Sequence, residues 1–113
     1  MRLENETFGQ WTFRTAAAHP GAFRNEMGEW LQYRANFFIW GAFHSHADKV
    51  WNSGRRHYSA RTIGEFLRHQ TVLAEHSDEF KINDHLWPDL ARLYMLVHPE
   101  RSGFFETRGR RAA

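Results

Sequence analysis

Basic side chains gather between residues 55 and 68, and their type and spacing suit contacts with phosphate. A guanidinium group presents a planar fork of N–H donors that fits phosphate oxygens and the edge of guanine. One carboxylate, Glu65, opposes four arginines, so this stretch has a net charge of +3. We therefore predict nucleic-acid contacts here, although the same donors also fit carboxylates on a protein partner. The candidate contact residues are Arg55, Arg56, His57, Arg61 and Arg68.

The elements that must position these side chains are two helices joined by a short basic turn. Gly54 can adopt the positive φ that ends the first helix, and Ser59 can cap the second by accepting a backbone N–H bond. In the second helix, charged side chains fall on one side and apolar ones on the other. The apolar side consists of Ile63, Phe66 and Leu67. This arrangement is typical of a helix-turn-helix module, whose second helix enters the major groove of double-stranded DNA.

Charge is distributed unevenly over the rest of the chain. Residues 75–90 have a net charge of −4, and residues 101–111 have a net charge of +3. The acidic segment repels a polyanion, so a nucleic-acid-binding face should exclude it. Residues 109–113 are expected to form a flexible tail, and basic side chains in this tail and just before it should add phosphate contacts. The side chains concerned are Arg108, Arg110 and Arg111.

The eight histidines raise the question of a metal site. His44 and His46 stand two positions apart, and on a helix their side chains diverge by about 200°. His85 and Asp89 are four positions apart and can lie together, but two ligands do not make a site. The chain has no cysteine, which excludes thiolate ligands and disulfides. We therefore expect no metal and no cofactor.

No catalytic constellation is visible in the sequence. Ser59 lies near a histidine, but this is ordinary turn sequence, and Ser59 serves better as a helix cap. Carboxylates beside Lys81 offer ligands for Mg²⁺, namely Asp78, Glu79 and Asp84. We expect a binding protein rather than an enzyme, with a metal-dependent nuclease as the remaining enzymatic alternative.

Composition and periodicity predict a mainly α-helical, small single domain of helix-turn-helix or winged-helix character, with at most a small two-stranded sheet. At 113 residues, with 42% apolar and 16% aromatic residues, the chain can bury a real core. No apolar run approaches the roughly 20 residues that span a bilayer, and the N-terminus lacks a signal peptide's apolar region. We therefore expect a cytoplasmic protein without a membrane partner.

Apolar spacing and capping residues predict where the elements lie. Helices are expected over residues 16–18, 22–33, 36–53, 60–75 and 85–97, with Asn36 and Asp84 as caps. Short strands are expected over residues 80–83 and 104–106. Residues 1–34 are interpreted as an N-terminal extension that can be helical, residues 35–108 as a helical core domain, and residues 109–113 as the basic tail.

Three stretches of the chain carry a family signature. They are GRRHYSA at residues 54–60, FKIND at residues 80–84, and the group ARLY, HPE and GFF between residues 91 and 105. With them, the chain from about Ala35 to Arg108 resembles a family of short, largely uncharacterised proteins from bacteria, phages and prophages. The resemblance implies a phage or mobile-element setting, and therefore DNA transactions, regulation or interference with host defence.

Two kinds of partner remain open at this point. The first is DNA, bound by a small phage-type regulatory or accessory protein inside a bacterial host cell. The alternative is a host defence complex, bound by a phage-encoded inhibitor similar to an anti-CRISPR protein. Such an inhibitor needs an exposed aromatic patch, and five tryptophans is a high number for this length. The candidate partner-binding residues are Trp11, Trp30, Lys81 and Trp87, and a homodimer fits either interpretation.

Overall fold

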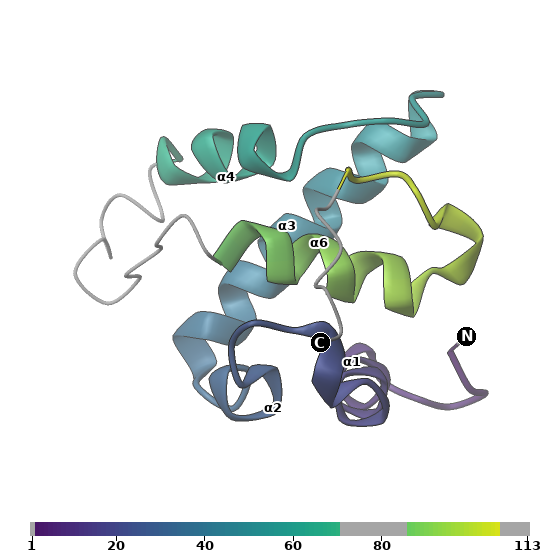
Figure 1. The fold of residues 1–113 in the computed structure, drawn as a ribbon, viewed down its shortest axis with the longest axis vertical. Coiled ribbons are helices and arrows are strands. Elements are labelled where there is room, and N and C mark those ends of the chain that lie inside the picture. The colour runs from purple at the N-terminus through teal and green to yellow at the C-terminus, as the bar shows by residue number, and fades with distance from the viewer. Residues whose placement is uncertain (1, 71–85, 107–113) are drawn as a thin grey trace.

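A computed structural model describes residues 2–70 and 86–106 of the chain, and within them it is mainly helical, as predicted. The helices are α1 (Phe8–Ala18), α2 (Met27–Trp30), α3 (Arg34–Asn52), α4 (Ala60–Arg68) and α6 (Leu86–Val97). Two short 3₁₀ turns, Pro20–Ala22 and Pro99–Arg101, accompany them. In Figure 1, α3 and α6 form a middle layer, with α4 on one side and α1 and α2 on the other.

Helix α3 buries one stripe of its surface, as its apolar spacing predicts. Trp40, Phe43 and Ala47 are fully buried at helical spacing. The helix begins earlier than expected, because Tyr33 is its N-cap residue and Asn36 lies inside the first turn. The Asn36 side-chain amide donates to the Trp30 carbonyl at 2.9 Å, so its prediction as a cap was wrong.

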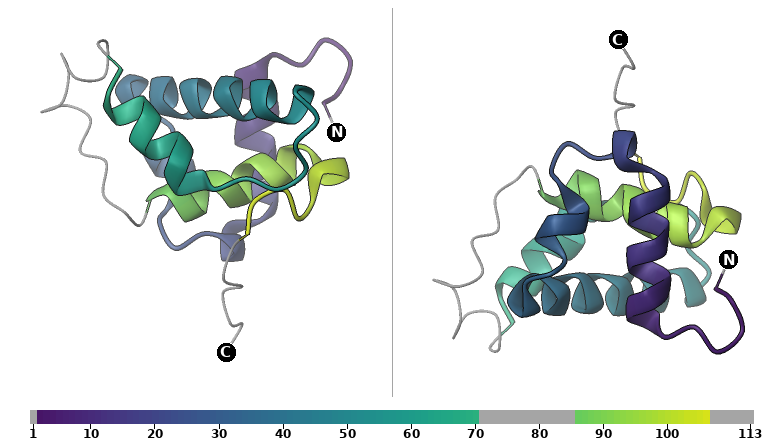
Figure 2. Two further views of the ribbon diagram at one scale, coloured as in Figure 1. Left: turned by 90° about the horizontal axis from the view of Figure 1, so that it is seen from above. Right: turned by 90° about the horizontal axis from the view of Figure 1, so that it is seen from below.

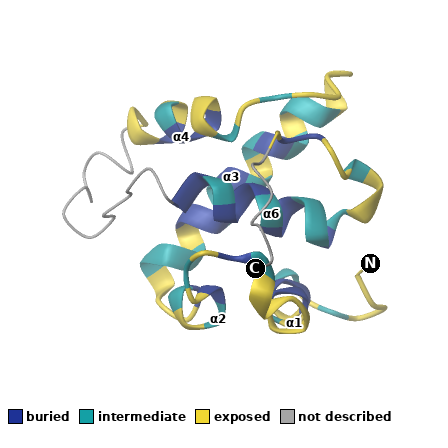
Figure 3. Cartoon of the chain, viewed as in Figure 1, coloured by how far each residue is buried: buried dark blue, intermediate teal, exposed yellow. Residues whose placement is uncertain are grey.

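Helix α6 lies beside α3 and buries the apolar stripe that its sequence predicts (Figure 2). The members of that stripe, all buried, are Leu86, Leu90, Leu93, Tyr94 and Val97. Pro88 stands in the first turn of the helix, where its missing N–H costs nothing. Figure 3 shows the buried residues concentrated where α3 and α6 meet.

The N-terminal third shares this core. Helix α1 is longer than predicted and begins with a capping box, in which Thr7 Oγ1 accepts from Gln10 N at 3.0 Å and Gln10 Oε1 accepts from Thr7 N at 2.9 Å. Trp11, Met27 and Leu31 belong to the same buried cluster as the residues of α3 and α6. The expected division at residue 34 therefore does not separate two cores.

The helix predicted over residues 22–33 is interrupted. Only Met27–Trp30 is α-helical, because the chain before it is held by a buried carboxylate. Asp89, fully buried on α6, accepts from Arg24 N at 2.9 Å and from Asn25 N at 2.8 Å. Arg92 Nη1 lies 3.2 Å from the same carboxylate and balances its charge. These N–H groups are used by Asp89 instead of by a helix.

The predicted sheet is reduced to one contact within the described residues. Phe105 forms an isolated parallel bridge with Tyr58, whose N–H donates to Phe104 O at 2.9 Å. The prediction of a strand over residues 104–106 was therefore wrong, and a winged helix stays a prediction. Helix α4 ends at Arg68 with His69 as its C-cap, so the prediction of one helix from Ala60 to about Glu75 was wrong. The strand predicted over residues 80–83 and the Asp84 cap lie outside the described residues. Within the described ranges, no helix combines the length and apolar character needed to cross a bilayer.

Candidate functional site

The connection between α3 and α4 presents the arginines, and both of its predicted caps are confirmed. Gly54 has a φ of 100°, which an L side chain rarely adopts, and it follows the end of α3. Ser59 is the N-cap of α4, and its hydroxyl accepts from Thr62 N at 3.3 Å. The connection is not a tight turn, however: it spans residues 53–59, against about three or four residues in a helix-turn-helix.

Arg55 and Arg56 are exposed on this connection and rest on aromatic rings. The Arg55 guanidinium lies 5.7 Å from the centre of the Tyr58 ring, and the Arg56 guanidinium lies 4.1 Å from that of Trp51. Arg56 Nη1 also donates to the carbonyl oxygens of Trp51 and Arg55, at 2.9 and 3.1 Å. Arg56 therefore supplies a hydrogen-bond donor to a backbone carbonyl at the C-terminal end of α3, and these contacts fix the position of its side chain.

Helix α4 buries Ile63 and Leu67, as predicted, but its inward face includes Gly64 and leaves out Phe66. Gly64 packs directly against the Trp87 ring, which points Ile63 and Leu67 into the core. Phe66 stands two positions beyond Gly64, about 200° around the helix, and is 47% exposed. Its placement on the buried side was wrong. The Phe66 ring instead lies 4.5 Å from the ring of His46 on α3.

The basic residues form what we call the basic edge: Arg55, Arg56, His57 and Arg61, all exposed. Among the residues that the structure describes, none of these three arginines forms an ion pair with a carboxylate. Arg68, at the far end of α4, is exposed too but lies 3.6 Å from Glu65. Four of the five predicted contact residues are thus exposed on the connection and the first turn of α4, and Arg68 is exposed at the far end of that helix.

The remaining predicted contact residues lie elsewhere. Arg108, Arg110, Arg111 and Lys81 are outside the described residues. Trp11 and Trp87 are buried in the core, with 7% and 2% of their surface exposed, so their prediction as partner-binding residues was wrong. Trp30 is half-buried against the same core. The reason is packing: irregular position in the sequence did not mean exposure, because α1 and α6 both turn their tryptophans inward.

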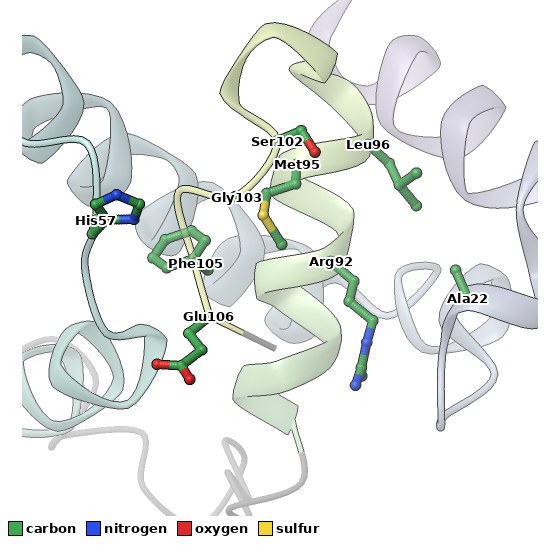
Figure 4. A pocket seen from close by; sticks show the side chains of 9 residues that line it. All are labelled: Ala22, His57, Arg92, Met95, Leu96, Ser102, Gly103, Phe105 and Glu106. Atoms are coloured by element: carbon green, nitrogen blue, oxygen red, sulfur yellow. The ribbon is translucent and has the colours of Figure 1, made fainter. Parts of the chain in front are cut away.

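An open groove of about 610 Å³ adjoins the basic edge at His57 (Figure 4). Its apolar floor includes Met95, Leu96 and Phe105, and Arg92 and Glu106 supply charge around it. In Figure 4, Phe105 lies between His57 and Arg92. The groove thus extends the basic edge toward the outer face of α6.

A second group of polar side chains, not identified from the sequence, lies between α3 and the C-terminal end of α6. His44 Nε2 is 2.8 Å from His98 Nε2, so the two imidazoles share one hydrogen bond. Asp48 Oδ1 accepts from Tyr94 Oη and from Arg101 Nη1, each at 2.7 Å. We call these five residues the His–Asp cluster.

Burial decides the protonation of the two histidines. It lowers the pKa of His44 to about 4, against the opposing charge of Asp48. Burial and the charge of Arg101 also lower the pKa of His98, although Asp48 and Glu100 oppose this. Both rings are therefore neutral at pH 7. The sequence held one local signal of the cluster, the four-residue spacing of His44 and Asp48, but His98 joins them from 50 residues away.

Comparison with known proteins finds no matching family model, no matching curated protein and no matching solved structure. Function is therefore inferred from the chemistry of the site's own residues.

Proposed function

We propose that this protein binds nucleic acid, most favourably double-stranded DNA, through the basic edge and the exposed side of α4. The observation that supports this is the exposure of Arg55, Arg56 and Arg61 on one edge without a carboxylate partner among the described residues. An exposed guanidinium whose charge no carboxylate neutralises can replace the counterions condensed on a phosphate backbone. The role is that of a helix-turn-helix-like regulatory or accessory protein.

The start of α4 adds a second attraction for phosphate. The first N–H groups of a helix have no partner within the helix, and its dipole favours negative charge there. Arg61 lies in this first turn, and Arg55 and Arg56 lie just before it. In this proposal the free backbone N–H groups and the Arg61 side chain both attract phosphate at the start of α4, as they do where helices bind phosphate.

Order in the arginine side chains favours binding as well. Arg55 rests on Tyr58, and Arg56 is held by Trp51 and two carbonyl groups. A side chain that is already ordered loses less conformational entropy when it meets a ligand.

The test is binding of a fluorescent DNA duplex, measured by anisotropy over a series of salt concentrations. The logarithm of the binding constant should fall with the logarithm of salt concentration, by a slope of about 0.9 for each phosphate contacted. Arg55→Glu and Arg61→Glu should each weaken binding and reduce this slope. Arg34→Glu is the matched control, because it makes the same charge change on an exposed residue at the opposite end of α3.

The outcomes distinguish binding at the basic edge from an effect of the protein's overall charge. If Arg34→Glu weakens binding as much as Arg61→Glu, only overall charge matters and the basic edge is not the interface. A wild-type protein with no affinity for duplex at low salt contradicts the proposal altogether.

We propose a protein-binding module as the second candidate, such as an inhibitor of a host defence complex. The observation that favours it is the exposure of aromatic side chains: Tyr33 is 62%, Phe38 49% and Phe66 47% exposed. Exposed aromatic residues are enriched where proteins bind one another. Capture of a stoichiometric host complex by the wild-type chain, and its loss with Phe66→Ser but not with Arg61→Glu, would support this candidate over the first.

A further inference from the structure

The His–Asp cluster brings three potential metal-ligand residues, two histidines and one aspartate, together from α3 and the residue that follows α6. His44 and Asp48 lie one turn apart on α3, and His98 directly follows α6. One ligand atom of each residue lies within 4.8 Å of those of the other two. We propose that His44, Asp48 and His98 form a binding site for a divalent transition-metal ion of the zinc type.

The distances fit such an ion after small side-chain movements. His98 Nε2 is 2.8 Å from His44 Nε2 and 3.9 Å from Asp48 Oδ1. Ligands at about 2.0 Å from a tetrahedral ion stand roughly 3.3 Å from one another. The first separation must therefore widen and the second shorten by about half an ångström each, which rotation about side-chain bonds supplies.

The donor set selects the class of metal. Two imidazoles and one carboxylate suit zinc and its transition-metal neighbours, whereas magnesium and calcium require oxygen ligands. Imidazole binds a metal only in its neutral form, and burial keeps both rings neutral at pH 7. Three protein ligands leave one position of a tetrahedral ion for water.

Residues around the three ligands hold them in place. His98 Nδ1 lies 3.4 Å from Glu100 Oε1, which directs Nε2 toward the site. His44 Nδ1 lies 3.6 Å from Asp48 Oδ2, so His44 can hold its proton there when Nε2 binds the ion. Tyr94 Oη and Arg101 Nη1 both donate to Asp48 Oδ1, the oxygen used in the distances above, and they hold the carboxylate in place.

An ion at this position joins α3 to the end of α6 beneath α1. The Phe8 ring lies 4.8 Å from the His44 ring, and the Trp11 ring lies 5.1 Å from the His98 ring. Because the site exists only in the folded chain, metal binding should raise the melting temperature. This consequence does not involve nucleic acid, so the metal site and the proposed DNA interface can fail separately.

The test is titration of the chelator-treated full chain with Zn²⁺, followed by calorimetry, and with Co²⁺, followed by its visible spectrum. We expect one ion per chain, the intense visible bands of four-coordinate Co²⁺, and a higher melting temperature. His98→Gln should weaken Zn²⁺ binding at least about tenfold. The matched control is His69→Gln, which removes an exposed histidine at the end of α4 and should leave the affinity unchanged.

Each outcome decides the proposal. Absence of Zn²⁺ binding, equal loss in the two histidine variants, or the weak spectrum of six-coordinate Co²⁺ would overturn it. If His98→Gln does not fold, as judged by circular dichroism, Asp48→Asn replaces it. The spectrum of the wild-type protein loaded with Co²⁺ also distinguishes a four-coordinate from a six-coordinate ion without any variant.

Discussion

Gly64 of α4 packs against the indole ring of Trp87 so closely that a side chain would not fit between them. A Cβ atom at Gly64 would lie 2.6 Å from Trp87 Cδ2, and Trp87 is buried on every side. This contact sets how near α4 approaches α6. It also sets which side of α4 faces outward, and therefore where Arg61 is presented.

The first prediction follows from this contact. Gly64→Ala should destabilise the fold by about 1–3 kcal/mol, because the added methyl group forces the Trp87 ring to move or α4 and α6 to separate. Urea denaturation measures the change. Gly41→Ala is the control: Gly41 lies inside α3, and an added methyl group there would meet nothing within 4 Å, so this change should stabilise the helix by about 0.5–1 kcal/mol. Equal effects of the two substitutions would contradict the contact.

The second prediction concerns the buried carboxylate of Asp89. Asp89→Asn should lower the free energy of unfolding by about 2–4 kcal/mol, because the amide cannot accept all the bonds from residues 24 and 25 and the negative charge beside Arg92 is removed. Chemical denaturation measures this loss. Glu29→Gln removes an exposed carboxylate nearby and should change stability little. If Asp89→Asn leaves the free energy of unfolding unchanged, the carboxylate does not hold the N-terminal segment.

The third prediction concerns the start of α4. Ser59→Ala should cost about 1 kcal/mol, because the N–H of Thr62 loses its partner. Ser45→Ala, at an exposed position inside α3, should leave stability unchanged or raise it slightly. Thermal unfolding of both variants gives the comparison, and hydrogen exchange of the Thr62 amide should speed up in Ser59→Ala alone.

The fourth prediction is a pH dependence at the N-terminus. Glu6 Oε2 lies 2.7 Å from Arg14 Nε, and this bond lowers the pKa of Glu6 from 4.5 to about 2. Because the pKa is lower in the folded chain, the stabilisation is complete above pH 4.5 and is lost as the pH falls from 4.5 toward 2.

An NMR titration of the Glu6 carboxyl carbon checks this pKa. Arg14→Gln should move its midpoint back toward 4.5, while Arg34→Gln, which makes the same charge change elsewhere, should not. An ordinary midpoint in the wild-type chain would show that the Glu6–Arg14 pair does not form in solution.

Local chemistry made several features predictable from the sequence. The apolar stripes of α3 and α6 recur at helical spacing, and they are buried as expected. Gly54 marks the end of α3 because glycine adopts a positive φ easily. Ser59 marks the start of α4 because its hydroxyl accepts a hydrogen bond from the backbone three residues later. The exposure of the arginines at 55, 56 and 61 followed from the same short-range pattern.

Other features depend on which surfaces meet, and a single sequence does not specify this. Residues 24 and 25 leave the helical conformation because Asp89, more than 60 residues later, takes their N–H groups. Phe66 faces outward because Gly64 meets Trp87.

The sequence by itself therefore determined a helical chain with a basic connection between two of its helices, since spacing and caps act over a few residues. Only the tertiary structure decided that Trp11 and Trp87 are buried and that His44, Asp48 and His98 converge. The physical reason is that burial and ligand geometry arise from contacts between distant segments, whose pairing follows from the packing of the whole core.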